Sequence, residues 1–456
     1  MSATIAIIVW FLAAAVALVR PKWGAALIWP AIWLYPNSAL YGTLPLNVRF
    51  DDLWFVFMFL LALGYARGRG GGGTLLLLAA AWSFSMILGN LTGLFVTGGF
   101  DWQQVVKSSL KVLYVPMIVY ILTAFIRDER DLVGHMKAMG LAATAAGALG
   151  IAMLYYPAEF NMFLIPGYKV IGFRVFSAEE LVQAGEIVSR RAQGAVGTLY
   201  LATLSMAVGL MMLSMMLYYP RQRLRAYFGV LAGCCMVTLG YTVMRGTIGG
   251  LIAAVLWAIV FTRRRAALVA VSLAGVAFLV IQGGLLERVL LRFIGEAGAR
   301  TAPFMEGLAG RFAIWRMFVE NFSPIYLLTG MGMSSVVRMA KGSAHSAYLG
   351  AFVYGGILGV VVMVAIVVRA WRIGRQLRMR LDPFSQGCGV FLTMVLIGLL
   401  VGGITNEIFQ HVGSMQLLFA SMVLAQKWLD MARVPGVLPD AGLLPAGPSP
   451  GYALAP

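Results

Sequence analysis

Charged side chains are scarce in this chain of 456 residues: Asp, Glu, Lys and Arg make up 12% of it, whereas hydrophobic residues make up 61%. An average soluble domain contains about 25% charged residues. So few polar side chains cannot cover a water-exposed surface of normal size. Because the apolar residues come in runs of roughly 17 to 25, long enough to cross a bilayer as helices, the composition excludes an ordinary soluble enzyme and indicates an integral membrane protein.

Cysteine is also scarce, and its positions exclude a second group of protein classes. The three cysteines, Cys234, Cys235 and Cys388, all lie inside apolar runs. They indicate neither a disulfide framework nor a metal cage. The glycine-rich segment 69–73 is not a phosphate loop, because no Lys-Ser/Thr pair follows it. Neither pattern predicts a metal site or a phosphate site.

Hydropathy predicts an all-α fold, a polytopic bundle of about 12–13 transmembrane spans with a large outer loop that carries short amphipathic helices. The candidate spans cover residues 3–19, 23–36, 52–66, 74–98, 105–126, 132–156, 195–219, 225–244, 246–262, 266–283, 346–368, 386–409 and 413–429. The second span is short and contains Pro30, so it is either re-entrant or packed inside the bundle.

The charges that are present are mostly basic, and their positions predict an orientation. Lys and Arg number 35 against 18 Asp and Glu, which leaves a net charge of +17. Basic residues follow every odd-numbered span, and positively charged loops stay in the cytoplasm. We expect the N-terminus outside, the C-terminus inside and the even-numbered connections outside. In a membrane protein, such an excess of basic residues points first to loops that face anionic lipid, and only second to a nucleic-acid partner.

The chain is expected to form a single transmembrane domain over residues 1–434, with long outer loops at about 157–194 and 284–345. Periodicity within the second loop predicts amphipathic helices near 286–293 and about 310–322. In the latter, Arg316 faces Glu320 across one helical turn. Residues 435–456 are rich in Pro and Gly and predict a disordered cytoplasmic tail.

Arginines on the expected outer face are the most informative residues. Arg245 sits in a tight turn between two apolar spans; the two long outer loops contain Arg190, Arg191, Arg288, Arg311 and Arg338. The planar guanidinium bonds two oxygens at once and keeps its charge, which suits a diphosphate. A site that grips a lipid-linked diphosphate is one interpretation. For Arg245 taken alone, a second interpretation is that its side chain extends to the phospholipid headgroups.

Three residues near the expected outer face are candidates for acid–base chemistry. His345, one of three histidines, falls where the second outer loop enters the span at 346–368. A neutral imidazole there can take a proton from an attacking hydroxyl; the alternative is a helix-start histidine bonded to backbone. His411 is a second candidate. Glu407 either orients a base or forms an ion pair.

Several short motifs occur in one order on the expected outer side. They are Arg191 to Gly194, Arg245-Gly246, Gly310 to Trp315, Thr329 to Gly332, and His345-Ser346 with Leu349, Gly356 and Gly359. In this combination, which covers roughly residues 190–360, the chain resembles the bacterial O-antigen ligase and polymerase superfamily of membrane glycosyltransferases.

The resemblance implies an enzyme of the bacterial inner membrane that moves a glycan from undecaprenyl diphosphate to an acceptor hydroxyl at the periplasmic face. It needs neither metal nor nucleotide sugar. Arg191, Arg245 and Arg311 would bind the diphosphate, and His345 would be the general base. The acceptor is a further repeat unit in an O-antigen or exopolysaccharide polymerase and the lipid A core in a ligase. The outer region 37–52 favours the polymerase.

Two other functions remain open from the residues alone. A transporter or flippase for the same lipid-linked glycan would need ionisable residues deep within its spans and halves related by a repeat. Lys107 and Lys111 are the main ionisable residues of this kind, and no internal repeat is evident. A nucleotide-sugar enzyme would need an inner carboxylate pair. The acidic residues at 128–131 lie where a helix begins, so helix capping explains them more simply.

Overall fold

The computed structural model describes residues 3–34, 50–65, 73–97, 102–155, 198–242, 244–281, 312–320, 323–332 and 345–432. Regular structure in these ranges is helical, without strands. The predicted all-α fold is therefore confirmed. Most of both long outer loops, and the segment 435–456, lie outside the described residues.

The helices follow one another along the chain with short connections in most places. They are α1 (Ala3–Val19), α2 (Pro21–Ala26), α3 (Ile28–Trp33), α4 (Phe50–Tyr65), α5 (Gly73–Thr97), α6 (Trp102–Val112), α7 (Tyr114–Phe125), α8 (Glu129–Tyr155), α10 (Thr198–Tyr218), α11 (Gln222–Thr242), α12 (Arg245–Phe261), α13 (Arg265–Ile281), α16 (Tyr326–Thr329), α18 (Ala347–Arg378), α19 (Pro383–Gly402) and α20 (Val412–Met431). A further short helix covers 312–320.

Seven helical segments among the described residues are long and apolar enough to cross a membrane. They lie within α5, α6–α7, α8, α10, α11, α18 and α19. The protein is therefore a multi-pass membrane protein. Several other apolar runs form helices of only 16 or 17 residues, among them α1, α4 and α12. The apolar run that contains Pro30 forms the two short helices α2 and α3, and Trp29 and Trp33 of α3 are buried in the bundle.

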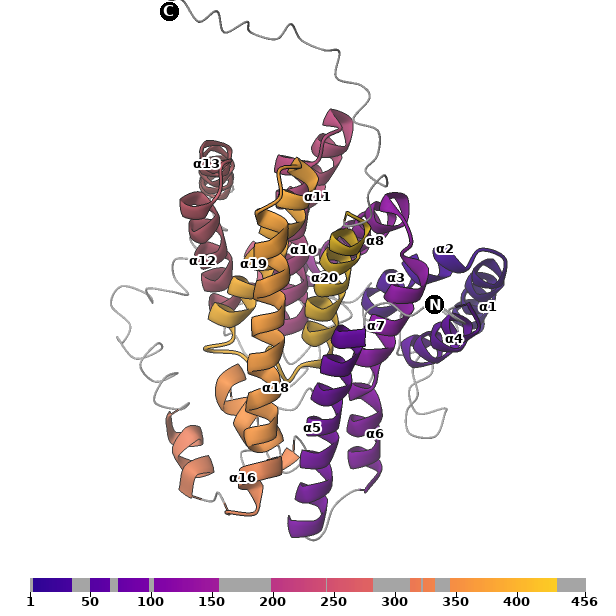
Figure 1. Cartoon of the computed structure of the whole chain (residues 1–456), viewed down its shortest axis with the longest axis vertical. Helices are drawn as coiled ribbons and strands as arrows, with labels where there is room; N and C mark the ends of the chain where they lie inside the picture. Colours follow the sequence, from indigo (N-terminus) through magenta and orange to yellow (C-terminus); the bar gives the residue numbers. More distant parts are fainter. Residues whose placement is uncertain are drawn as a thin grey trace, which may run out of the picture.

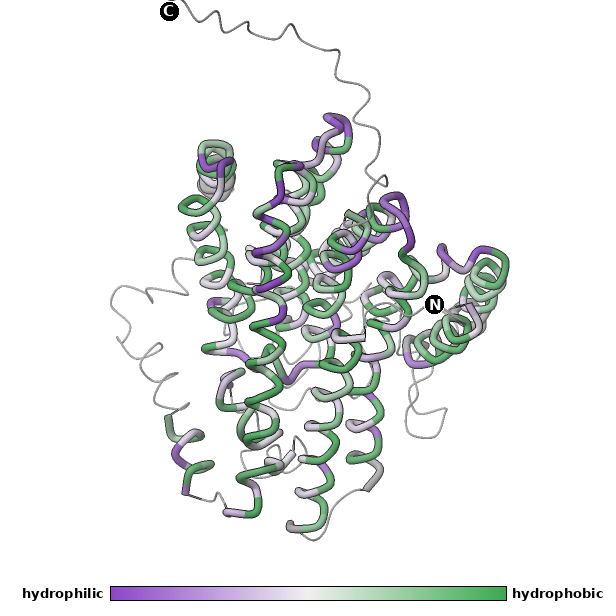
Figure 2. The backbone as a smooth tube through the Cα atoms, in the orientation of Figure 1, coloured by the Kyte–Doolittle hydropathy of each residue, from purple (hydrophilic) through white to green (hydrophobic). Residues whose placement is uncertain are grey.

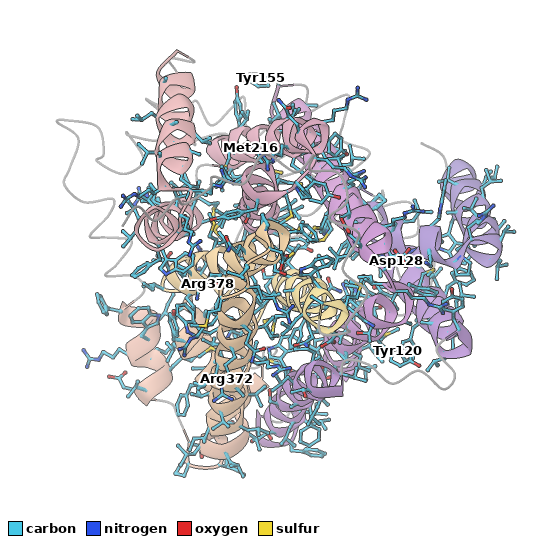
Figure 3. All side chains as sticks on the ribbon, turned by 45° about the horizontal axis from the view of Figure 1, so that its top comes forward. Tyr120, Asp128, Tyr155, Met216, Arg372 and Arg378 are labelled. Carbon is cyan, nitrogen blue, oxygen red and sulfur yellow. The ribbon has the colours of Figure 1, made fainter. Side chains whose placement is uncertain are left out.

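One end of the bundle collects the hydrophilic connections. The α10–α11, α12–α13 and α18–α19 connections and the beginning of α8 lie at the top of Figure 1, and Figure 2 shows hydrophilic colour there and mostly hydrophobic colour along the helices below. Figure 3, in which this end comes forward, shows Asp128, Arg372 and Arg378. The Arg378 guanidinium lies 4.7 Å from the centre of the Trp257 ring. We call this the basic end.

Close glycine contacts fix α12 against α19. A Cβ atom built on Gly250 of α12 would lie 2.3 Å from the carbonyl oxygen of Gly398 in α19. Small residues of this kind let the backbones of membrane helices approach and pack directly. This crossing holds α12 in register with α19, so that the N-terminal end of α12 meets the segment that follows α19.

Helix α18 is interrupted at Gly356, whose φ of +61° lies in the left-handed region. A Cβ atom at this position would lie 2.4 Å from the carbonyl carbon of Leu328. The backbone amide of Met331 donates to the carbonyl of Val353 at 2.8 Å. The kink therefore has an identifiable cause: it makes room for the 323–332 segment and lets that segment bond to the helix.

The short helix at 312–320 matches the amphipathic helix predicted at about 310–322. Arg316 and Glu320 are exposed and joined by an ion pair, with 2.6 Å between Nε and Oε1. Val319 also lies on the surface, 73% exposed. The helix thus exposes both charged and apolar side chains.

Candidate functional site

Residues 403–411, which connect α19 to α20 and which we call the 403–411 turn, bring the described candidate residues into one region. Glu407 and His411 belong to the turn itself. The first residues of α12, which include Arg245, contact it on one side. The first residues of α18, which begins two residues after His345, contact it on another.

Arg245 is positioned by its neighbour Gly246. A Cβ atom at Gly246 would lie 2.2 Å from Oγ1 of Thr405 and 2.4 Å from Nδ2 of Asn406. Asn406 in turn donates from Nδ2 to the carbonyl of Gly402 at 3.2 Å, which fixes its side chain. Only glycine permits this approach, so the Arg-Gly pair places a half-buried guanidinium-bearing residue against the 403–411 turn.

His345 adopts a left-handed backbone conformation, with positive φ, which in the rest of the described chain only glycines adopt. Its φ is +51°, and it is the only non-glycine residue with positive φ among the described residues. Ser346 follows as the N-cap of α18, and its hydroxyl accepts a long bond from the amide of Leu349, at 3.5 Å. The sequence His-Ser therefore turns the chain sharply into the helix, and the histidine occupies the strained position.

Two hydrogen bonds tie the start of α18 to the 403–411 turn. The amide of Ala347 donates to the carbonyl of Gly403 at 2.7 Å. The side-chain nitrogen of Gln410 donates to the carbonyl of Ala347, also at 2.7 Å. Gly350 makes room for this Gln410 side chain, since a Cβ atom there would lie 2.7 Å from the amide carbon. His345, two residues before Ala347, is therefore held beside the turn.

Glu407 is oriented by a tyrosine of α18. The Tyr354 hydroxyl donates to Oε1 of Glu407 at 2.5 Å. Bonds of this length to a carboxylate are charge-assisted and stronger than neutral ones. The prediction for Glu407 left orientation of a base and ion pairing open; the structure adds this hydroxyl partner. The carboxylate is held at the same turn that both the Arg245 and His345 segments contact.

His411 is packed against an aromatic ring. Its ring centre lies 5.0 Å from that of Tyr200, whose hydroxyl accepts from the Trp33 indole at 2.9 Å. Its Nδ1 atom is buried, although the side chain as a whole is partly exposed. Burial, with a further contribution from the charge of Lys111, lowers the pKa of His411 to about 4. This imidazole is neutral at physiological pH, and its contacts are those of a packing residue.

Two glycine motifs singled out in the sequence pack against each other. Thr329 bonds through its hydroxyl to the Thr92 hydroxyl of α5, at 2.8 Å. Gly330 has a φ of +73°, and a Cβ atom there would lie 2.4 Å from the carbonyl carbon of Tyr354. The Thr329–Gly332 motif thus meets α18 at Gly356 and Tyr354. Its position supports the part of α18 that carries the Glu407 partner.

The remaining predicted site residues, Arg190, Arg191, Arg288, Arg311 and Arg338, lie outside the described residues. Within the described ranges, no group of three His, Cys, Asp or Glu side chains is arranged to hold a metal ion.

Sequence reasoning missed the residues that connect the candidates. Tyr354, Gln410 and Tyr200 are the ones that position Glu407, the α18 start and His411. The available signal was a polar group inside or beside an apolar run, which is costly in a membrane unless it is bonded. That signal does not name the partner, because the partners lie far apart in the sequence.

No protein-family model matches the chain, and no curated protein matches it.

Proposed function

We propose that the protein is a membrane glycosyltransferase that moves a glycan from undecaprenyl diphosphate to an acceptor hydroxyl at the periplasmic face of the bacterial inner membrane. The observation that supports this most directly is the contact of the 403–411 turn with both the Arg245-Gly246 segment and the segment that follows His345. A cationic side chain for a diphosphate and an imidazole for a hydroxyl thereby belong to one region, together with a carboxylate held in place by Tyr354.

The proposed reaction is a direct displacement. The acceptor oxygen attacks the anomeric carbon while the bond from that carbon to the diphosphate breaks. The acceptor proton passes to His345, and undecaprenyl diphosphate leaves with the bonding electron pair. Arg245 stabilises the charge that develops on the leaving group, with Arg191 and Arg311 as further proposed ligands. A single displacement of this kind inverts the anomeric centre.

Glu407 and His411 have different proposed roles. Because Glu407 bonds to Tyr354 and belongs to the turn, we assign it to the positioning of the reacting groups. His411 is a positioning residue as well, since its ring packs on Tyr200 and its pKa of about 4 keeps it neutral. The metal-independent mechanism requires only the binding of charge and the transfer of one proton.

The basic end supplies the proposed orientation. Its connections carry many of the arginines of the chain, and such loops remain in the cytoplasm. The C-terminus, which follows α20, is then cytoplasmic, and the 403–411 turn is reached from the periplasmic side. The polymerase remains the first choice and the ligase the second; they differ in whether a repeat unit or the lipid A core is the acceptor.

The test is a transfer assay with purified protein in detergent and a lipid-linked oligosaccharide donor, in which a longer or newly attached glycan is measured. A transporter or flippase would form no new glycosidic bond. Arg245→Lys keeps the charge and loses the planar fork, so we expect weaker donor use; Arg245→Ala should be weaker still. Arg316→Ala is the matched control, because Arg316 is exposed and its guanidinium is already paired with Glu320.

Three results decide the proposal. Transfer by the wild type, reduced by both Arg245 substitutions and unchanged in Arg316→Ala, supports it. Absence of transfer with every lipid-linked donor and acceptor offered, while the protein moves the same donor across vesicle membranes, supports the transporter. Equal loss in Arg316→Ala and Arg245→Ala would remove Arg245 from the donor site.

A further inference from the structure

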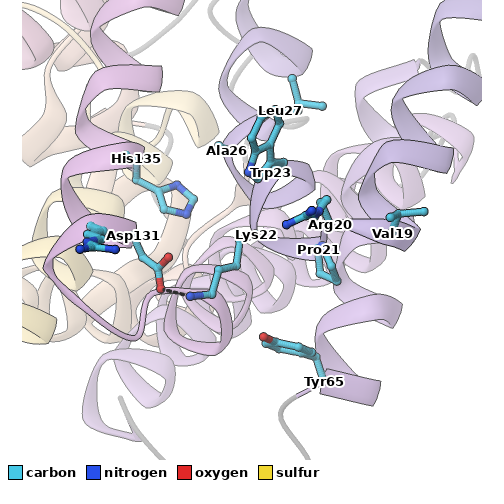
Figure 4. Close-up of a pocket in the computed structure, with 12 residues that line it drawn as sticks. Val19, Arg20, Pro21, Lys22, Trp23, Ala26, Leu27, Tyr65, Asp131 and His135 are labelled. Atoms are coloured by element: carbon cyan, nitrogen blue, oxygen red, sulfur yellow. Dashed lines mark hydrogen bonds and ion pairs between the residues drawn. The ribbon is translucent and has the colours of Figure 1, made fainter.

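A cavity of about 500 Å³ lies where the α1–α2 connection meets the beginning of α8. The beginning of α8 belongs to the basic end, and no residue of the 403–411 turn lines the cavity. Figure 4 shows the labelled residues around it: Arg20, Lys22 and Trp23 come from the α1–α2 side, and Asp131 and His135 from α8. The proposed transfer reaction uses none of these residues.

The lining of this cavity carries an excess of positive charge. Arg20, Lys22 and Arg130 are basic, and Asp131 is the acidic lining residue. The Lys22 ammonium donates to Oδ2 of Asp131 at 2.6 Å, which pairs these two charges. No hydrogen bond or ion pair of the Arg20 or Arg130 side chains occurs among the described residues. Two guanidinium groups therefore remain for an anion.

A buried polar atom gives a second, independent indication of a ligand. His135 is 3% exposed, lines the cavity, and its Nδ1 has no hydrogen-bond partner among the described residues. In Figure 4 its ring extends from α8 toward the space between Trp23 and Lys22. A buried ring nitrogen without a partner is costly unless a ligand bonds to it.

The rim of the cavity is apolar and faces outward. Val19 is 77% exposed and Trp23 is 68% exposed. Leu12 lies seven residues before Val19, and so on the same side of α1, and is 62% exposed. Exposed aliphatic side chains next to a tryptophan and basic residues are the arrangement found where a membrane protein meets the boundary between acyl chains and headgroups. A ligand in this cavity can therefore keep its apolar part against α1.

We propose that this cavity binds the phosphate of an anionic phospholipid from the leaflet at the basic end. Arg20 and Arg130 bond to the phosphate oxygens, His135 contributes its buried nitrogen, and the acyl chains lie along α1 past Val19 and Trp23. Basic pockets between helices at this membrane face suit such headgroups. The bound lipid joins the N-terminal helices to α8, in parallel with the Lys22–Asp131 ion pair.

The experiment measures lipid retention by native mass spectrometry of the delipidated full-length protein in detergent. The probes are phosphatidylglycerol, phosphatidylcholine and inorganic phosphate, each titrated separately. We compare the wild type with Arg20→Gln/Arg130→Gln and with Arg223→Gln, an exposed arginine at the start of α11 outside the cavity. Both cavity arginines are exposed, so these substitutions are not expected to unfold the protein; far-ultraviolet circular dichroism checks this.

We expect the wild type and Arg223→Gln to retain one phosphatidylglycerol in preference to phosphatidylcholine, and the double variant to bind it about tenfold more weakly, which corresponds to about 1.4 kcal/mol. Equal retention by the double variant overturns the proposal. Competition by inorganic phosphate at the same concentration as the lipid also overturns it, because the site then takes a soluble anion. If the double variant unfolds, Arg130→Gln alone is measured, and the same two outcomes decide.

Discussion

The backbone of His345 allows its chemical role to be separated from its structural one. A histidine at φ +51° carries strain that glycine does not have, and asparagine tolerates this conformation better than most residues. His345→Gly and His345→Asn therefore both preserve the turn into α18 and both remove the imidazole. His345→Ala removes the imidazole as well, but it keeps a Cβ atom in the strained conformation.

The expected magnitudes differ for stability and for activity. Relief of left-handed strain is worth about 1 kcal/mol, so His345→Gly should unfold at the same temperature as the wild type or above it. Loss of a general base should lower the transfer rate by about 10²- to 10⁴-fold in all three variants. In His345→Gly, added imidazole should restore part of the rate, because the substitution leaves space where the side chain was.

The assays are thermal unfolding in detergent and initial rates of glycan transfer with lipid-linked donor. If His345 is only a helix-start residue, His345→Gly and His345→Asn will keep transfer rates close to that of the wild type while His345→Ala loses stability. That pattern would refute the assignment of His345 as the base. A low rate in all three variants, with imidazole rescue confined to His345→Gly, is the pattern the base assignment requires.

Further predictions concern the contacts of the 403–411 turn and its surroundings. Gly246→Ala should lower the unfolding temperature by an amount equivalent to about 1–3 kcal/mol, since the new Cβ atom meets Thr405, whereas Gly249→Ala, with open space around it, should not. Tyr354→Phe removes a hydrogen bond to a carboxylate. It should lower the free energy of unfolding, or raise the activation free energy of transfer, by about 1.5–3 kcal/mol, measured by the same two assays. Because the pKa of His411 is about 4 in the folded state and near 6.5 when unfolded, the unfolded chain binds more protons between these values. Stability should therefore fall as pH drops from 6.5 toward 4, and the fall should be smaller in His411→Phe; an identical pH dependence in both proteins would contradict this.

Hydropathy predicted the helical bundle because spanning a lipid bilayer requires long apolar helices, and these are visible in the sequence as long apolar runs. It did not predict where helices stop. The run at 105–126 contains Pro116 and is divided at Leu113 into α6 and α7, and the run at 23–36 is divided at Leu27. In both runs the first helix ends four residues before a proline, Pro116 or Pro30, which cannot donate to the carbonyl at that position and clashes with it. The sequence therefore contains the cause of these breaks, although a hydropathy profile does not show it.

The candidate site was predictable in its residue types and less so in its connections. Arg245 and His345 stood out because a charge or an imidazole at the edge of an apolar span needs a reason. The 403–411 turn is contacted by their chain neighbours, through Gly246, Ala347 and Gln410, and two of these three are unremarkable in the sequence. Long-range backbone bonds of this kind leave no local pattern.

The break in α18 has a mechanical consequence. Because the amide of Met331 donates to the Val353 carbonyl, the 323–332 segment stabilises α18 in its kinked form. If this segment moved away, the Val353 carbonyl would lose its partner and α18 would no longer be held at the kink. Tyr354, the next residue after Val353, donates to Glu407, so the 323–332 segment and the Glu407 carboxylate are held by neighbouring residues of one helix.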